Sequence, residues 1–408
     1  MIPEFYSEPI MENIKNRRLL KVLKNKKGGP VIIFFAGIHG NEHAGIIAFE
    51  HFLNELDTEK LQGSIYAISG NLKALSKNKR FLDCDLNRMW TSARMMKKSF
   101  KKEIYSEDKE QHELNEILNE IIKEHKSSLY FIDLHTTSSD TLPFITINDS
   151  LINRRFSKLF PVPVILGIEE YLEGPLLSYI NKLGYVSLGF ESGQHISKEA
   201  VVNARAFIKL AMYYSGVLDC SDIEKEYNTL QKSAEGNSKI YEIIYRYNIL
   251  KNEHFKMKPG FSSFELQEKG TLLATSDDKD IYLSKKATLF MPLYQKKGED
   301  GYYLIRKIEP FFLKLSALIR NIKADNILTL LPGVKWENSD KSALIIDLRI
   351  ARFLAKQIFH LLGYRSRELG PNFIKVSSRD RVSKTELYED LQWYKKTLSV
   401  KKGLNNSH

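Results

Sequence analysis

Short, continuous apolar runs mark the first half of the chain. Residues 31–36 (VIIFFA) are wholly apolar, are entered through Gly-Gly-Pro, and are followed by glycines at positions 37 and 40. A short run of this kind is typical of a strand that is buried on both faces. The same pattern predicts further strands at residues 64–69, 129–134 and 185–190.

Segments with helical periodicity lie between these runs. We predict helices over residues 42–56, 109–126 and 198–214. In the second of them the apolar residues recur at i, i+3, i+4, i+7 and i+8, which is one face of a helix. These residues are Leu114, Ile117, Leu118, Ile121 and Ile122. Strands that alternate with helices predict an α/β domain with a largely parallel sheet over residues 1–225.

The pattern changes in the second half of the chain. Residues 220–238 are polar and irregular, which predicts a linker. Short apolar runs separated by turn residues then predict a small β-domain over residues 240–310. Residues 311–408 form a C-terminal extension that mixes strand and helix, with a helix expected near Leu344–Leu362, and its role cannot be read from the sequence. The last dozen residues are expected to fray.

The composition is that of an ordinary soluble globular protein, with 43% apolar and 27% charged residues in a chain of 408. No apolar run is long enough to cross a bilayer, so no membrane partner is expected. The first residues lack the basic and apolar regions of a secretory signal. The chain has only two cysteines, Cys84 and Cys220, which makes a disulfide framework improbable. These features together predict a cytoplasmic protein in a reducing environment.

The formal net charge of the chain is +11. A well-solvated, lysine-rich surface is the favoured interpretation, and a field that attracts acidic substrates is the alternative. No zinc-finger or RNA-recognition signature occurs in the sequence, so nucleic acid is not an expected partner. The sequence leaves open whether the chain forms a homo-oligomer.

Three ionisable side chains stand where predicted strands end. His39 follows the strand at 31–36, His135 closes the strand at 129–134, and Glu191 follows the strand at 185–190. Because ligands bind at the carboxyl ends of strands in open α/β sheets, these groups are expected to meet at one edge. Glu42 lies three residues after His39, so both side chains could reach one ion.

Two histidines and one carboxylate suit a catalytic zinc site, in which three protein ligands leave one position for water. His39, Glu42 and His135 are therefore the candidate ligands, and Glu191 is the candidate general base and acid. Taken singly, each histidine is more often a hydrogen-bonded structural residue. Asp133 could orient a histidine ligand, and His43 could compete as a ligand.

The segment from Arg80 to Arg88 lies between the two histidine motifs. Two arginines and Asn87 within nine residues could clamp a substrate carboxylate, since a guanidinium matches carboxylate geometry. A loop held by internal Arg–Asp pairs explains the same residues equally well. Cys84, in the middle of the segment, is better explained as a packed thiol than as a nucleophile.

Three motifs in this order resemble the succinylglutamate desuccinylase/aspartoacylase family, a group of zinc-dependent relatives of the metallocarboxypeptidases. They are GIHGNE at residues 37–42, DCDLNR at 83–88 and DLHTTS at 133–138. The resemblance to the catalytic domain covers residues 25–215. Residues 255–308, with MPLYQ and GEDG, also resemble the small C-terminal β-domain of the family. The resemblance implies a zinc-carboxypeptidase-like, mixed-sheet α/β/α sandwich with a smaller β-domain and an α/β extension.

The resemblance also implies roles for individual residues. Zinc would bind His39, Glu42 and His135. Glu191 would serve as general base and then as the acid for the leaving amine, and Arg80 would polarise the scissile carbonyl. Asn87 and Arg88 would hold the α-carboxylate of the substrate. The partner that the resemblance implies is a small N-acyl amino acid, bound as the substrate.

The leading hypothesis is a zinc-dependent amide hydrolase that cleaves an N-acyl amino acid into a carboxylate and an amino acid, with zinc-activated water. A metallocarboxypeptidase acting on peptides or cell-wall fragments would use the same zinc ligands. A non-catalytic module with a degenerate zinc site is the alternative of another class. A serine hydrolase is disfavoured, because no Gly-x-Ser-x-Gly motif occurs in the sequence.

Overall fold

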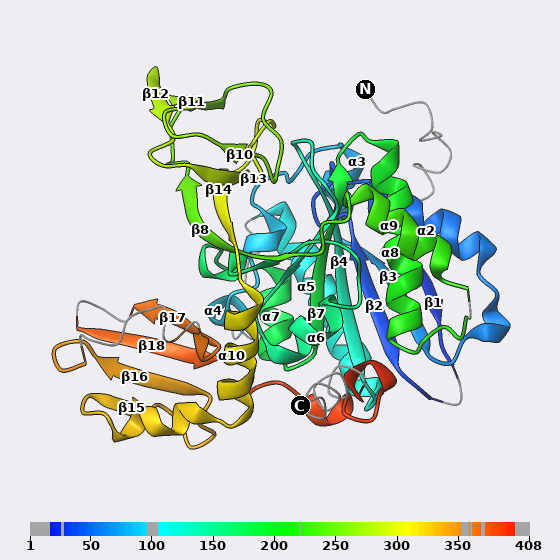
Figure 1. Ribbon diagram of the computed structural model, residues 1–408. Helices are drawn as coiled ribbons and strands as arrows, with labels where there is room; N and C mark the ends of the chain where they lie inside the picture. Colours follow the sequence, from blue (N-terminus) through cyan, green and yellow to red (C-terminus); the bar gives the residue numbers. More distant parts are fainter. Residues whose placement is uncertain are drawn as a thin grey trace, which may run out of the picture.

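The computed structural model describes residues 17–25, 28–95, 105–220, 222–351, 359, 361–368 and 372–395. The last dozen residues, for which fraying was predicted, lie outside these ranges. A mixed sheet of 11 strands runs through the described part of the chain (Figure 1). In spatial order its strands are β1 (Leu19–Leu23), β3 (Ser64–Ser69), β2 (Val31–Ala36), β4 (Leu129–Thr137), β7 (Val186–Gln194), β5 (Phe144–Ile147), β6 (Val164–Leu166), β8 (Ile240–Asn248), β14 (Asp300–Lys307), β13 (Ala287–Phe290) and β10 (Leu266–Gln267).

The centre of this sheet is parallel and its margins are mixed. Strands β3, β2, β4 and β7 run parallel, whereas β1 and β5 are antiparallel to their neighbours β3 and β7. The strands β8, β14, β13 and β10 form an antiparallel continuation. The prediction of a mixed-sheet α/β fold is therefore confirmed.

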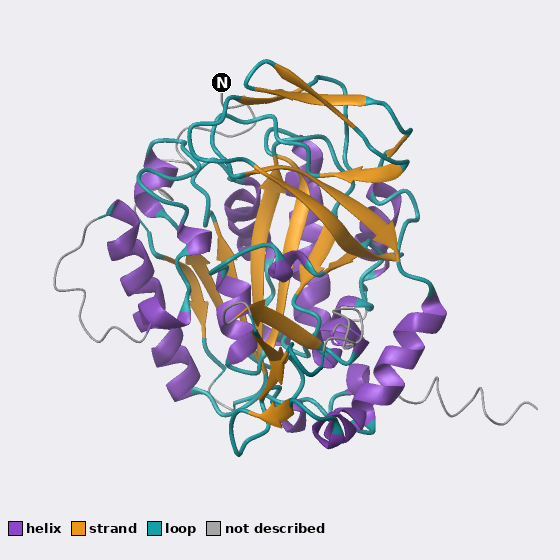
Figure 2. Cartoon of the chain, turned by 90° about the vertical axis from the view of Figure 1, so that its left-hand side faces the viewer, coloured by secondary structure: helices purple, strands orange, loops and turns teal. Residues whose placement is uncertain are grey.

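Helices cover both faces of the parallel strands, as Figure 2 shows. On one face lie α2 (Ala44–Glu55), α6 (Leu151–Ser157) and α8 (Lys198–Tyr214), and on the other lie α5 (Ser106–Glu124) and α7 (Leu176–Lys182). The position of β2 between two layers of helices explains why residues 31–36 are all apolar. Ile32 and Phe34 point into the core under α2, α6 and α8. Ile33 and Phe35 point into the core under α5 and α7, and all four side chains are at most 1% exposed.

The small β-domain is continuous with the sheet of the first half of the chain, because β8 pairs in parallel with β6. A separate three-stranded sheet of β9 (Phe255–Met257), β11 (Leu272–Ser276) and β12 (Lys279–Tyr282) packs beside this continuation. The extension begins with α10 (Pro310–Asn321) and then forms an antiparallel sheet. Its strands are β15 (Val334–Trp336), β16 (Ala343–Asp347), β18 (Phe373–Ser378) and β17 (Tyr364–Glu368).

The end of the described chain returns to the hydrophobic core of the parallel sheet. Tyr388 is fully buried, and its hydroxyl accepts a hydrogen bond from the Val186 amide at 3.1 Å. Trp393 donates to the Tyr130 hydroxyl at 3.0 Å. The C-terminal extension is thus part of the hydrophobic core that supports strands β4 and β7.

One prediction of secondary structure is wrong, and another is wrong in its first part. The expected linker at 220–238 contains helix α9 (Glu224–Ser233), which packs on α8 through the fully buried Leu230. The helix expected near Leu344–Leu362 begins instead as strand β16, hydrogen-bonded on both sides by β15 and β18. In this strand Leu344 and Ile346 are buried and Ile345 is half-buried, which is the alternation of a strand. Residues 352–358 lie outside the described ranges.

Two strands are longer than predicted, and this matters for the site. Strand β4 extends to Thr137 and β7 extends to Gln194, so that His135 and Glu191 lie inside the strands. They are register partners on these neighbouring parallel strands. No helix in the described part of the chain is both long and apolar enough to cross a membrane.

Candidate active site

A tight turn after β2 places His39 at the carboxyl edge of the sheet. Gly37 has a φ of +70°, a left-handed conformation that favours glycine. At Gly40 a Cβ atom would lie 2.1 Å from the Ala74 carbonyl carbon, so no larger residue fits there. The turn therefore requires both glycines of the first motif, and it brings His39 opposite the end of β4.

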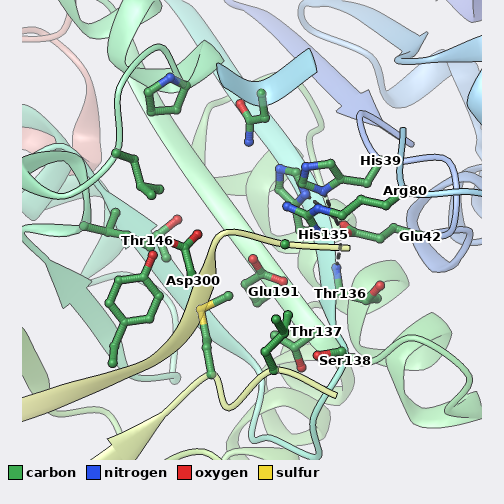
Figure 3. A pocket seen from close by; sticks show the side chains of 18 of the residues that line it. His39, Glu42, Arg80, His135, Thr136, Thr137, Ser138, Thr146, Glu191 and Asp300 are labelled. Carbon is green, nitrogen blue, oxygen red and sulfur yellow. Dashed lines mark hydrogen bonds and ion pairs between the residues drawn. The ribbon is translucent and has the colours of Figure 1, made fainter. Parts of the chain in front are cut away.

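Glu42 stands between the two histidines (Figure 3). Its Oε1 lies 2.7 Å from His39 Nδ1, and its Oε2 lies 2.9 Å from His135 Nδ1. The Thr136 amide also donates to Oε2, at 3.1 Å. Burial alone would raise the pKa of Glu42, but the two histidines hold it well below its usual value.

The three side chains form a compact donor set. His39, Glu42 and His135 are all buried, and one donor atom from each lies within 4.8 Å of the others. Two imidazole nitrogens and one carboxylate oxygen are a donor set that zinc accepts. This group could therefore hold a metal ion.

The far nitrogen of each imidazole faces a carboxylate. His39 Nε2 lies 3.2 Å from Asp85 Oδ1, and His135 Nε2 lies 2.8 Å from Asp133 Oδ2. Burial would lower the pKa of His135, but Asp133 and Glu42 outweigh it and raise the pKa well above its usual value. Carboxylates in these positions fix the tautomer and ring orientation of metal-binding histidines, and leave both Nδ1 atoms facing Glu42.

His43, considered as a competing ligand, lies outside this donor set. It is the N-cap residue of α2 and is 7% exposed. Asp133, considered as a supporting residue, is the carboxylate that faces His135.

Arg80 reaches the pocket beside the donor set. Its Nη2 lies 3.1 Å from Asp85 Oδ2, and its Nη1 lies 3.5 Å from Glu42 Oε1. Its Nε is buried and has no hydrogen-bond partner among the described residues. The guanidinium is therefore held beside Glu42, and its Nε–H is a further donor that a ligand could use.

Asn87 and Arg88 lie in the short helix η2 (Leu86–Arg88) and also line the pocket. The Asn87 side chain accepts a hydrogen bond from the Leu176 amide at 2.9 Å. Arg88 Nη2 donates to Asp300 Oδ2 at 3.1 Å. The two explanations of the Arg80–Arg88 segment thus coexist, because both arginines face the pocket and both are paired with aspartates.

Cys84 has the surroundings of a packed thiol. Burial, with a further effect from Glu107, raises the pKa of its thiol to about 11. Its Sγ lies 3.4 Å from Met89 Sδ. A thiol in this state is a poor nucleophile at neutral pH.

Glu191 completes the set of residues predicted from the sequence. Its carboxylate faces the pocket near the donor set (Figure 3). Burial raises the pKa of Glu191 to about 7. Its Oε2 has no hydrogen-bond partner among the described residues. A carboxylate with a free oxygen and a pKa near neutrality is suited to proton transfer.

Sequence reasoning missed several polar residues that surround this centre. Thr136 Oγ1 lies 2.7 Å from His195 Nδ1, and Gln295 Oε1 accepts a hydrogen bond from Asn41 Nδ2 at 3.0 Å. Gln295 comes from the β-domain and lines the pocket. Its motif, MPLYQ, was the available signal, since it had already marked this segment as similar to the β-domain of the family.

Comparison with known proteins tests the family resemblance. Residues 28–196 match the family model of the succinylglutamate desuccinylase/aspartoacylase catalytic domain. The predicted family resemblance is confirmed. The chain is 38% identical over 74 residues to a succinylglutamate desuccinylase of Photorhabdus laumondii, and 28% identical over 120 residues to the aspartoacylase of Mus musculus. These alignments cover 18% and 29% of this chain, and only 23% and 38% of the relatives' lengths.

Solved structures of the family share the fold over a larger part of the chain. A succinylglutamate desuccinylase/aspartoacylase from Rhodobacter sphaeroides has a TM-score of 0.54 and 17% identity, over 71% of this chain and 88% of that one. The succinylglutamate desuccinylase of Vibrio cholerae has a TM-score of 0.52 and 13% identity, over 74% and 95% of the two chains. The predicted zinc-carboxypeptidase-like fold is therefore confirmed.

Proposed function

We propose that this protein is a zinc-dependent amide hydrolase that releases the acyl group of an N-acyl amino acid. The observation that carries the proposal is the pairing of His135 with Glu191 across β4 and β7. In this register the Glu191 carboxylate, whose Oε2 has no hydrogen-bond partner among the described residues, lines the same pocket as the buried donor set of His39, Glu42 and His135. A metal site and a proton-transfer group at one point are what metal-assisted hydrolysis needs.

Each side chain of the site would have its own role in the reaction. His39, Glu42 and His135 would hold zinc, which when bound acidifies a water molecule and polarises the acyl carbonyl. Glu191 would accept the proton of that water and return it to the departing amine nitrogen. Arg80 would donate to the oxyanion that develops on the carbonyl oxygen.

Asn87 and Arg88 would bind the α-carboxylate of the substrate. A guanidinium has five N–H donors, and Arg88 uses one on Asp300 and one on the Asn87 carbonyl. Enough donors remain for one substrate carboxylate. Both cysteines are free, which suits a reducing compartment such as the cytoplasm.

A hydrolysis screen tests the proposal. The purified protein, with and without a stoichiometric zinc supplement, is assayed against N-acetyl and N-succinyl amino acids and against short peptides. We expect release of free amino acid from at least one N-acyl amino acid, loss of this activity after chelation, and recovery with zinc. Hydrolysis of peptides alone would replace the proposal with a carboxypeptidase.

The variant Glu191→Gln tests the role of the base. We expect it to retain zinc and to lose at least 100-fold in kcat, in line with general-base catalysis. Glu199→Gln is the matched control, because Glu199 is an exposed carboxylate near the start of α8. Full activity of the zinc-loaded Glu191→Gln variant would refute the assignment.

A further inference from the structure

Asp300 places a carboxylate of the β-domain inside the proposed active site. It begins strand β14, and Figure 3 shows its side chain beside Thr146 and Glu191. Arg88 Nη2 donates to its Oδ2, and Arg246 Nε donates to its Oδ1. Arg246 also donates to the Tyr171 carbonyl at 2.6 Å. Asp300 is therefore anchored from two sides and cannot easily swing away from a ligand.

This arrangement leaves the pocket short of cationic partners for a ligand. Among the described residues that line it, Arg80 and Arg88 are the arginines, and there is no lysine. Each of the two is already paired with an aspartate, Arg80 with Asp85 and Arg88 with Asp300. The pocket can offer Arg88 to one substrate carboxylate, but it has no further guanidinium for a second one.

The carboxylates of the pocket outnumber its guanidinium groups. Four of the described residues that line it carry a carboxyl group. They are Glu42, Glu169, Glu191 and Asp300. Zinc would offset the charge near Glu42, whereas Asp300 uses its two carboxylate oxygens on Arg88 and Arg246. A second carboxylate on the substrate would lose its hydration there without finding an unpaired cation, which is costly in a partly buried site.

Hydroxyl and amide side chains such as Thr146 and Gln295 line much of the remaining wall. The wall also has an apolar part. It combines side chains from the catalytic domain with side chains from the β-domain. These are Ile147, Ile168, Leu172, Leu177, Met291 and Pro292. Such a wall favours an apolar group and disfavours a charged group that finds no partner.

We infer that the pocket selects N-acyl amino acids with an uncharged, apolar side chain, and that Asp300 is the specificity-determining residue that excludes an acidic one. This inference rests on the proposed function and narrows it to one substrate class. Specificity here comes from the absence of a free cationic partner as much as from apolar contact.

The experiment compares kcat/KM for N-acetylleucine and N-acetylmethionine with kcat/KM for N-acetylaspartate and N-acetylglutamate. For the wild type we expect the apolar substrates to be at least about tenfold better. Asp300→Asn keeps the shape of the side chain and removes its charge. We expect this variant to reduce the kcat/KM ratio of apolar to acidic substrates about tenfold, mainly through a lower KM for the acidic substrates.

Glu299→Gln is the matched control, because it removes the same charge one residue away, at an exposed position that does not line the pocket. We expect the control to keep the wild-type preference within about twofold. The inference is overturned if the wild type prefers N-acetylaspartate, or if Asp300→Asn leaves the preference unchanged. Melting temperature and zinc content establish that Asp300→Asn is folded and loaded.

Binding to the Glu191→Gln variant separates this inference from the proposed function. Calorimetry with N-acetylleucine and N-acetylaspartate gives the charge preference without turnover. Tighter binding of N-acetylleucine with no hydrolysis by the wild type would contradict the proposed function alone. Tighter binding of N-acetylaspartate would overturn the inference alone, and binding of neither would overturn both.

Discussion

Arg379 Nε lies 3.0 Å from Glu169 Oε1, and this ion pair joins the C-terminal extension to the wall of the proposed active-site pocket. Both side chains are almost fully buried. Arg379 also pairs with Glu170, and the Asp149 amide donates to Glu169 Oε1 at 3.2 Å. The extension is therefore not an appendage, because one of its side chains holds a residue that lines the site.

Replacing Arg379 should affect both stability and substrate binding. Arg379→Gln leaves Glu169 buried without its cation, which costs about 3 kcal/mol in the free energy of unfolding. Because Glu169 lines the pocket, we expect KM to rise more than kcat falls. Urea unfolding and steady-state kinetics measure the two effects, and Arg379→Lys should restore part of each.

Arg349→Gln provides the control for this prediction. Arg349 lies in the same extension and pairs with Asp347, but its side chain is 58% exposed. An exposed pair of this kind contributes about 0–1 kcal/mol. An equal effect of both substitutions would show that Arg379 has no special link to the pocket.

Asp133 should strengthen metal binding through His135. Asp133→Asn replaces the carboxylate that faces His135 Nε2 at 2.8 Å with a neutral amide. Loss of such a partner lowers metal affinity about 10–100-fold. Competition for zinc with a chelating indicator measures the change. Asp140→Asn, at an exposed position shortly after the same strand, should bind zinc as the wild type does.

The pH dependence of the reaction should report Glu191. Burial raises the pKa of this carboxyl from 4.5 to about 7. The positive charge of a zinc ion bound nearby would lower it. As a base Glu191 must be deprotonated, so kcat/KM should fall as the pH decreases, with a midpoint between 4.5 and about 7. A pH–rate profile of the zinc-loaded enzyme checks this. A rate that is flat across this interval would exclude Glu191 as the base.

Asp149 should make the fold sensitive to acid. Burial would raise its pKa, but ion pairs with Arg154 and Arg320 outweigh this effect and lower the pKa from 3.8 to about 2. A lowered pKa in the folded state stabilises the protein above pH 3.8, and this contribution is lost as the pH falls towards 2. The shift corresponds to about 2 kcal/mol.

The variant Asp149→Asn tests this contribution. We expect it to lose about 3 kcal/mol at pH 7, because the buried Arg320 loses a partner, and to show a weaker acid dependence than the wild type. Denaturant unfolding at pH 7 and pH 3 measures both. Asp390→Asn, whose side chain is 99% exposed, should match the wild type at each pH. Identical acid dependence in Asp149→Asn and wild type would contradict the prediction.

The local pattern of apolar and polar residues was sufficient to predict the parallel core of the sheet. Strands β2 and β3 and helix α8 have the predicted bounds, because a run that is buried on both faces and an amphipathic helix both leave a strong periodic signal. Helix α9 and strand β16 were missed because each depends on packing against a neighbour more than on its own periodicity. Their sequences are compatible with more than one local structure.

By itself, the sequence determined the chemistry that gathers at the edge of the sheet. His39, His135 and Glu191 could be predicted to converge, since carboxyl ends of adjacent parallel strands share one edge. Only the tertiary structure decided which groups share the pocket with them. Asp300 and Glu169, with its partner Arg379, reach the site from segments far apart in the chain, and ion pairs between such segments leave no periodic trace in a sequence.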